Sequence, residues 1–425
     1  MKKFLFSFVY VSISLFGQQE INPPPFSPRL PFDAEVISLP RTDEDVSVYY
    51  TFKIPYRLLV FERKEELFEA SFRVIVEISD KDDTLVTRDI KDNKISVNRF
   101  EATDDFNLFL QDYLSFTLKP DHYIAIAIIS DMNSTGELPL MPIELKLDDN
   151  EKSLVLHPLV VNSQENVCND ERYFKLANSG GNIPFSVESY DLVIPVIDTL
   201  ITEIDVILEN NDDLVFSGKI DESHVESIGI TKCEDNILLT TVPENKLLRY
   251  FIIKNVNEKL NEGNLVLTIK NEEKNIDEEM DLKVVWINKP ISLLNPEKAI
   301  EFISYIESES IVSELLDEDE SDYSKVLNNY WKKFDPTPET TFNEIMFEYY
   351  GRVDYAIKEY KSIGNNNGAK TDRGMVYIKF GNPDKIERTS TSLGQVIEVW
   401  TYSNSQRKFS FIDKTGTGNF TLTEN

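Results

Sequence analysis

The period of the apolar residues along this chain changes at Pro290. Before it, apolar and polar residues alternate, as in LFEASFRVIVEIS at residues 67–79, and such alternation is typical of half-buried antiparallel strands. After it, apolar residues recur every three or four positions, as in YSKVLNNYWKKF at residues 323–334, which indicates a helix with one buried face. We therefore expect a mainly β chain whose helices follow residue 290.

The strand-rich part divides into two. A leucine and a turn followed by alternating apolar residues occur in LKPDHYIAIAII from residue 118 and again in LNEGNLVLTIKN from residue 260, each near the end of a β-rich stretch. We predict two tandem immunoglobulin-like β-sandwiches, at residues 35–150 and 151–290. In the second, Asn211 and Asp212 separate two alternating runs and predict a hairpin turn. One large β domain is the alternative.

The C-terminal part is predicted to be a helical connector at residues 291–334 followed by an α+β domain at residues 335–425. A helix of that domain is expected to begin with Thr337 as its N-cap and Pro338 at its first position. The segments MVYIKF, VIEVWTY, KFSFI and NFTLT then alternate and predict a small antiparallel meander. Such a meander needs a covering layer, which the preceding helices supply.

The N-terminal residues indicate export. Residues 1–17 combine two lysines with an apolar run too short to span a bilayer, which is typical of a signal peptide, and cleavage is expected after Gly17. Residues 18–34 are rich in proline and predict an extended arm. Since no later segment is long and apolar enough to cross a membrane and no cysteine precedes Cys168, we expect a periplasmic or extracellular protein without a lipid anchor or transmembrane segment.

Charge and residue types exclude several functions. Lys plus Arg number 44 against 74 for Asp plus Glu, and the net charge of -30 repels nucleic acid and anionic membrane surfaces. Because the chain is expected to be exported, an envelope or secreted protein is the expected partner. His122, His157 and His224 lack ligand spacing, and no glycine-rich phosphate loop occurs, so we predict neither a metal nor a cofactor. The acidic run LDEDESDY at residues 316–323 lacks the glycine and the terminal glutamate of a calcium loop, so we interpret it as a solvated helix connector. A calcium-stabilised adhesin is a further alternative that rests only on the acidic balance of the chain.

The two cysteines, Cys168 and Cys233, both lie in the second predicted sandwich. In an oxidising compartment they are candidates for a disulfide. The alternative is a pair of buried thiols, because the sequence does not determine the distance between them.

The segment TDRG, residues 371–374, is the strongest candidate for a site. Thr371 and Asp372 suit a turn in which their oxygens accept from backbone amides, and Gly374 allows the chain to bend into a strand. Arg373 suits a carboxylate partner, for which the candidates are Asp384, Glu387 and Glu398. The candidate binding residues are Thr371, Asp372, Arg373, Gly374, Asn382, Asp384 and Glu398. Either these residues only hold a turn, with Asn382 and Pro383 ending the strand, or they line a ligand pocket.

Several separated segments in residues 335–425 carry a resemblance. With YYGRVDYAIKEY, GAKTDRGMVYIKFGNPDKIE and EVWTYSNSQRKFSFIDKTGTGNFTL, this part resembles the GWxTD domain, a family of exported bacterial proteins named for the motif Gly-Trp-x-Thr-Asp. The motif corresponds to residues 368–372, with Ala369 in place of the signature tryptophan. The resemblance implies export and specifies no reaction.

We therefore expect a non-enzymatic interaction or scaffold protein of the bacterial envelope, with the C-terminal domain as its recognition element. The alternative is a carboxylate-dependent hydrolase or binder that acts on envelope polysaccharide or peptide through residues such as Asp372 and Glu398.

Overall fold

The computed structural model describes residues 33–105, 108–147, 153–162, 174–403 and 405–423. The predicted signal peptide and most of the predicted arm lie outside these residues. Strand structure already starts within the arm, because β1 (Asp33–Pro40) includes residues 33 and 34.

Residues 33–147, here called the first β block, form two antiparallel sheets. Sheet I contains β3 (Glu62–Lys64), β4 (Leu67–Asp80), β5 (Leu85–Val97), β7 (His122–Asp131), β8 (Glu137–Pro139) and β9 (Ile143–Lys146). Sheet II has the order β1-β2-β6, with β2 at Val46–Pro55 and β6 at Phe109–Leu118. The alternate apolar residues of β2 and β4, such as Phe52 and Phe72, meet in one core between the sheets.

Residues 153–285, here called the second β block, form two further sheets. Sheet III contains β10 (Leu159–Asn162), β11 (Phe174–Leu176), β13 (Asp191–Val196), β16 (Ser223–Glu226), β17 (Ile228–Cys233), β18 (Asn236–Thr241) and β19 (Leu248–Ile253). Sheet IV contains β12 (Ile183–Pro184), β14 (Ile204–Asn210), β15 (Asp213–Ile220), β20 (Gly263–Asn271) and β21 (Ile276–Val285). The predicted hairpin is confirmed: β14 and β15 pair antiparallel, and Asn211 and Asp212 both have positive φ, at 52° and 69°.

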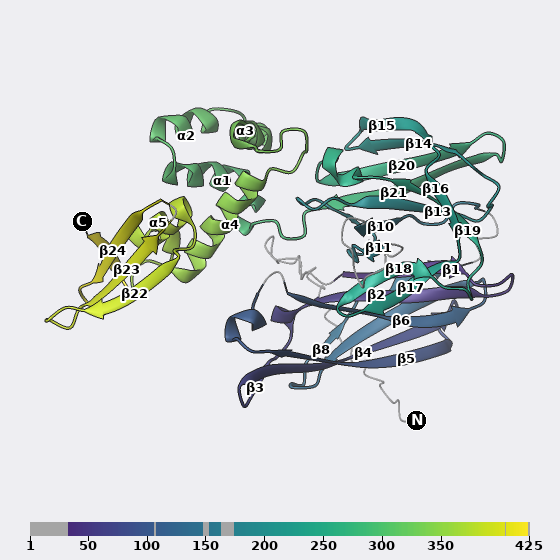
Figure 1. The fold of residues 1–425 in the computed structure, drawn as a ribbon, viewed down its shortest axis with the longest axis horizontal. Helices are drawn as coiled ribbons and strands as arrows, with labels where there is room; N and C mark the ends of the chain where they lie inside the picture. The colour runs from purple at the N-terminus through teal and green to yellow at the C-terminus, as the bar shows by residue number, and fades with distance from the viewer. Residues whose placement is uncertain (1–32, 106–107, 148–152, 163–173, 404, 424–425) are drawn as a thin grey trace, which may run out of the picture.

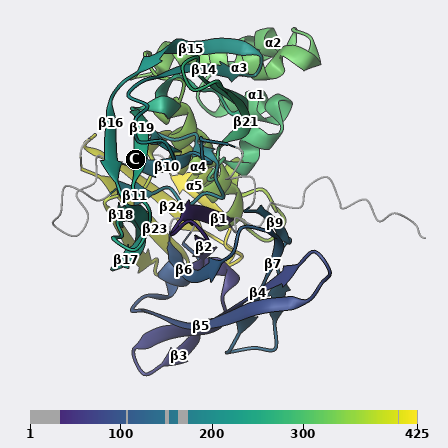
Figure 2. The same cartoon turned by 90° about the vertical axis from the view of Figure 1, so that its right-hand side faces the viewer.

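The two blocks are stacked through a core of their own. Ile37 and Tyr49 of sheet II pack with Leu159 and Ile230 of sheet III, so the four sheets form successive layers in the order I, II, III, IV (Figures 1 and 2). Strand β2 is consequently buried on both faces, whereas its alternation predicted burial of only one. Its polar face is buried because sheet III covers it and supplies hydrogen bonds, such as the one from Ser47 Oγ to Asn245 Oδ1 at 2.7 Å.

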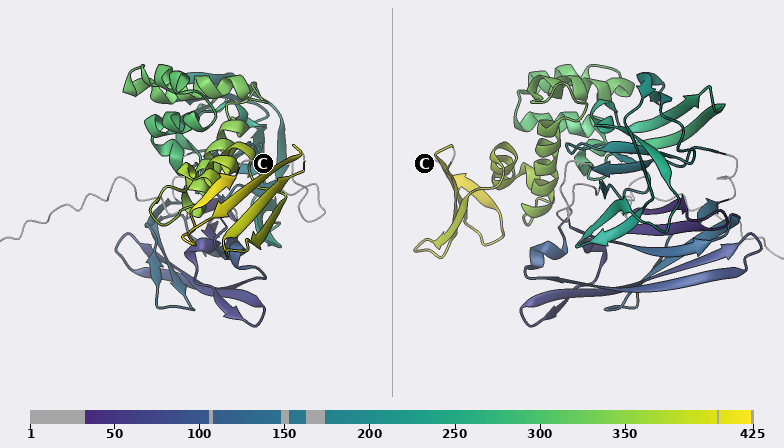
Figure 3. Two further views of the ribbon diagram at one scale, coloured as in Figure 1. Left: turned by 90° about the vertical axis from the view of Figure 1, so that its left-hand side faces the viewer. Right: turned by 45° about the vertical axis from the view of Figure 1, so that its right-hand side comes forward.

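After residue 290 the chain is helical and ends in a fifth sheet. The helices are α1 (Pro296–Phe302), α2 (Glu309–Leu316), α3 (Tyr323–Trp331), α4 (Glu344–Glu359) and α5 (Asp372–Phe380). Sheet V has the order β22 (Lys385–Ser390), β23 (Val396–Tyr402), β24 (Arg407–Asp413) and β25 (Phe420–Thr423). Figure 3 shows α4 and α5 between sheet V and the stacked layers. Within the described ranges, every helix is too short or too polar to cross a membrane.

One predicted strand of the meander is wrong. MVYIKF belongs to α5, and the first strand of sheet V is instead β22. A run of six residues cannot distinguish a period of 2 from one of 3.6. The local signal that decides is Thr371, the N-cap, whose side chain accepts from Gly374 N.

The predicted start of the preceding helix is also wrong. Helix α4 begins at Glu344, and its N-cap is Asn343, whose side chain accepts from Met346 N. Residues 335–341 form a strap that crosses to the second β block, where Thr341 N donates to Glu258 O at 3.0 Å. Thr337 and Pro338 instead lie in a separate turn, in which Thr340 N donates to Thr337 O at 2.9 Å.

Candidate functional site

The motif at residues 368–374 joins α5 to the end of α4. Thr371 Oγ1 accepts from Gly374 N at 3.1 Å and donates to Gly368 O at 2.7 Å. A Cβ on Gly374 would lie 2.0 Å from Gly368 O, and one on Gly368 would lie 2.1 Å from Ala356 O. Both glycines are therefore required by close backbone approach. The expected role of Gly374, a bend into a strand, is wrong because Gly374 lies in the first turn of α5.

The aspartates near the motif accept from backbone amides, although the amide that Asp372 holds lies on β25 and not in its own turn as expected. Asp372 Oδ2 accepts from Leu422 N on β25 at 2.6 Å, and Asp384 Oδ2 accepts from Ser403 N at 2.5 Å. Asn382 lies exposed in the turn between α5 and β22. Asp384 thus joins the start of β22 to the end of β23, and Asp372 joins α5 to β25.

Glu398, on the buried face of β23 in sheet V, is the centre of a polar cluster. Its side chain is 2% exposed; Oε1 accepts from Trp400 Nε1 and Oε2 from Arg388 Nε, both at 2.7 Å. Arg373 Nη1 lies 3.5 Å from Glu398 Oε1, so Glu398 is the partner among the three carboxylates predicted for Arg373. The contact uses one nitrogen of the guanidinium group.

Arg373 is also held by aromatic rings. Its guanidinium carbon lies 4.0 Å from the ring centre of Phe420 and 5.4 Å from that of Tyr360, and its side chain is only 11% exposed. Ala369, where the signature motif has tryptophan, is fully buried in the same core. Asp372 and Arg373 of the motif are therefore engaged within the fold.

A cleft that the sequence did not predict lies between sheet IV, α3 and the strap of residues 335–341. Its volume is about 610 Å³. The floor consists of nearly buried apolar side chains, namely Phe185, Trp286, Leu293, Leu327, Trp331 and Met346. No local pattern could have identified it, because its lining comes from segments that are far apart in the sequence.

The rim of the cleft is polar. Ser324 and Asn328 of α3 and Lys332, which directly follows α3, recur at spacings of four residues, and none of their side chains is hydrogen-bonded to another described residue. Across the cleft, Lys289 and Glu262 form an ion pair at 2.7 Å. The α3 side of the rim therefore presents polar groups available to a ligand.

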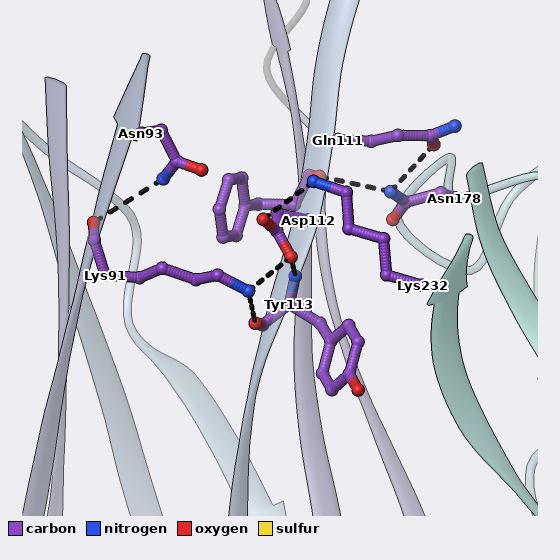
Figure 4. Close-up of polar contacts among 8 residues, drawn as sticks. Lys91, Asn93, Gln111, Asp112, Tyr113, Asn178 and Lys232 are labelled. Carbon is purple, nitrogen blue, oxygen red and sulfur yellow. Dashed lines mark hydrogen bonds and ion pairs between the residues drawn. The ribbon is translucent and has the colours of Figure 1, made fainter. Parts of the chain in front are cut away.

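A second buried polar cluster joins the two β blocks (Figure 4). Asp112 of β6 accepts from Lys91 Nζ of β5 at 2.6 Å and from Lys232 Nζ of β17 at 2.8 Å. Asn178 donates to Phe52 O at 3.1 Å and to Gln111 Oε1 at 3.2 Å. These contacts link sheets I, II and III around one carboxylate, which suits a structural role.

The cysteines lie apart from these clusters. Cys233 ends β17 and is disulfide-bonded. Its predicted partner, Cys168, lies outside the described residues, so the pairing itself stays a prediction.

Comparison with known families agrees with the motif. Residues 268–424 match the family model of the GWxTD domain. The match begins within β20, upstream of the resemblance at residues 335–425, and so includes the helices, sheet V and most of the cleft lining. No curated protein matches the chain. The C-terminal part of the chain, residues 268–424, therefore contains a GWxTD domain.

Proposed function

We propose that the chain is an exported, non-enzymatic interaction or scaffold protein of the bacterial envelope, with its recognition element in the C-terminal region. The observation that carries this proposal is that two carboxylates of the candidate site, Glu398 and Asp372, already have partners within the fold. Glu398 is held by Arg388, Arg373 and Trp400, and Asp372 accepts a backbone N–H.

This engagement weighs against the hydrolase alternative. An acid or base must reach the proton that it transfers, and a glycosidase needs two carboxylates that face the scissile bond. Glu398 is nearly sealed from solvent, and Asp372 is attached to β25. Neither group is placed to meet a substrate.

A scaffold role fits the way in which the parts are joined. The four sheets are stacked through continuous apolar cores, and the ion pair between Lys358 of α4 and Asp104, at 3.0 Å, connects the C-terminal region to the first β block. The immunoglobulin-like type of the two blocks, the domain boundaries and the export signal stay predictions from the sequence.

The test is cross-linking in intact cells, followed by mass spectrometry of the proteins that co-purify with the tagged full chain. We expect a defined envelope or secreted protein that is absent from an untagged control. Failure to recover any protein, together with altered envelope polysaccharide or peptide in a deletion strain, would favour the hydrolase. Arg373→Ala is a poor probe of binding here, because Arg373 is packed into the fold.

A further inference from the structure

We propose that the cleft between α3, sheet IV and the strap binds an extended peptide segment of the partner protein. This inference rests on the proposed interaction function and assigns it a site and a ligand class. It follows from the size, the rim chemistry and the floor of the cleft.

The cleft is preformed and of suitable size. Its volume of about 610 Å³ lies within the roughly 300–1,000 Å³ that is usual for ligand sites. The strap that closes one side is fixed to the second β block, since Thr341 N donates to Glu258 O at 3.0 Å and Lys259 Nζ donates to Glu339 O at 2.8 Å. A ligand therefore meets walls that are already in place.

The rim offers groups that match a peptide backbone. An asparagine amide both donates and accepts, and a serine hydroxyl does the same. Asn328 and Ser324 line the cleft on adjacent turns of α3 and have no hydrogen-bond partner among the described residues. They can therefore meet the alternating N–H and C=O groups of an extended segment.

The charges on the rim suit a ligand that carries both signs. Lys332, just after α3, and Glu339 on the strap are exposed, and neither side chain has an ion-pair partner in the described part of the chain. The other charges are occupied: Lys289 pairs with Glu262, and Asp335 Oδ1 accepts from Thr337 N at 2.9 Å. One available cation and one available anion fit a peptide with a carboxylate and an ammonium group.

The floor favours a peptide over a saccharide. Trp286 is 8% exposed and Trp331 only 2%. The ring centre of Trp286 lies 5.4 Å from that of Phe342, and the ring centre of Trp331 lies 4.9 Å from that of Tyr349. Their faces are therefore not available for a sugar ring to stack on. An aliphatic side chain of a peptide needs no such ring face and gains from contact with the apolar floor.

The test uses the purified full mature chain and random pentapeptides, with bound peptides selected by affinity and identified by mass spectrometry. Binding is then measured by tryptophan fluorescence, because Trp286 and Trp331 line the cleft. The remaining tryptophan, Trp400, belongs to β23 of sheet V and is fully buried away from the cleft. The key variant is Lys332→Glu. Its matched control is Lys325→Glu, which makes the same charge change at an exposed position within α3 that does not line the cleft.

We expect selected peptides to bind the wild type and Lys325→Glu alike, and to bind Lys332→Glu and Glu339→Lys about tenfold or more weakly. Circular dichroism checks that all variants remain folded. The inference is overturned if no peptide is selected, if all variants bind equally, or if maltopentaose changes the fluorescence and peptides do not. A partner that still co-purifies from cells with Lys332→Glu would overturn the cleft assignment and leave the proposed function standing.

Discussion

Lys232 Nζ of β17 lies 2.8 Å from Asp112 Oδ2 of β6, so an ion pair connects the second β block to the first. Lys91 of β5 reaches the other carboxylate oxygen at 2.6 Å. The same carboxylate accepts from Tyr113 N at 2.8 Å, which orients it (Figure 4). One buried side chain thus fixes three layers of the stack against each other.

Replacement of this carboxylate should weaken the joint between the blocks. Asp112→Asn leaves two ammonium groups without a counter-charge. We expect a loss of roughly 2 kcal/mol, below the about 3–5 kcal/mol typical of a fully buried pair, because the Lys232 and Lys91 side chains remain 29% and 38% exposed. Urea unfolding of the full chain measures this change.

The matched control is Asp92→Asn. Asp92 neighbours Lys91 on β5 and pairs with Arg73 at 2.6 Å, but both side chains are exposed. Loss of that solvent-screened surface pair should destabilise the chain much less than Asp112→Asn does. Equal effects of the two substitutions would contradict the structural importance of Asp112.

Two glycines should respond to alanine with opposite signs. Gly374→Ala places a Cβ 2.0 Å from Gly368 O, which is backbone and cannot swing away, so we expect destabilisation at or above the upper end of about 1–3 kcal/mol. Gly351→Ala, in an exposed turn of α4 with open space around it, should stabilise the chain by about 0.5–1 kcal/mol. Thermal unfolding compares them, and a neutral Gly374→Ala would refute the contact between α5 and residue 368.

The N-cap of α5 should depend on a hydroxyl. Thr371→Val keeps the shape but loses both hydrogen bonds of Oγ1, and we expect a loss of about 1–2 kcal/mol. Thr371→Ser retains the hydroxyl and should lose much less. Since Thr371 belongs to the signature motif, similar melting temperatures for the two variants would mean that the motif has another role.

Local patterns predicted much of the fold. The alternation at residues 67–79 became β4, the turn at Asn211 became a hairpin, and the helical spacing around Trp331 became α3. These elements are long or carry a specific turn signal. The double burial of β2 was missed because a strand's own sequence does not report which sheet covers its polar face.

The site was predicted in part. The capping role of Thr371 and the contact between Arg373 and Glu398 follow from side-chain chemistry near one motif, whereas the bond from Leu422 N on β25 to Asp372 was not predicted. The cleft was not predicted, because Trp286, Asn328 and Glu339 meet only when the helices pack on sheet IV. The spacing of residues along the chain does not show which distant segments come into contact in the fold.

The hairpin between β24 and β25 should weaken in acid through Asp413. Burial alone would raise the pKa of Asp413, but the N–H groups of Gly418, Thr415, Gly416 and Thr417 donate to the carboxylate and together hold its pKa below 3.8. A carboxyl with a lowered folded-state pKa stabilises the protein above its unfolded pKa, and this stabilisation is lost as the pH falls from about 3.8 through the lowered value.

Asp413→Asn should therefore be less stable than the wild type at pH 7, and the difference should shrink as the pH falls below 3.8. The asparagine amide can supply one acceptor but places a donor opposite Gly418 N, which donates to Oδ2 at 2.8 Å. Urea unfolding of both proteins between pH 7 and pH 3 measures the difference. The control is Asp281→Asn, at an exposed position of β21. A difference that stays constant over this range would show that the ionised carboxylate does not hold the loop.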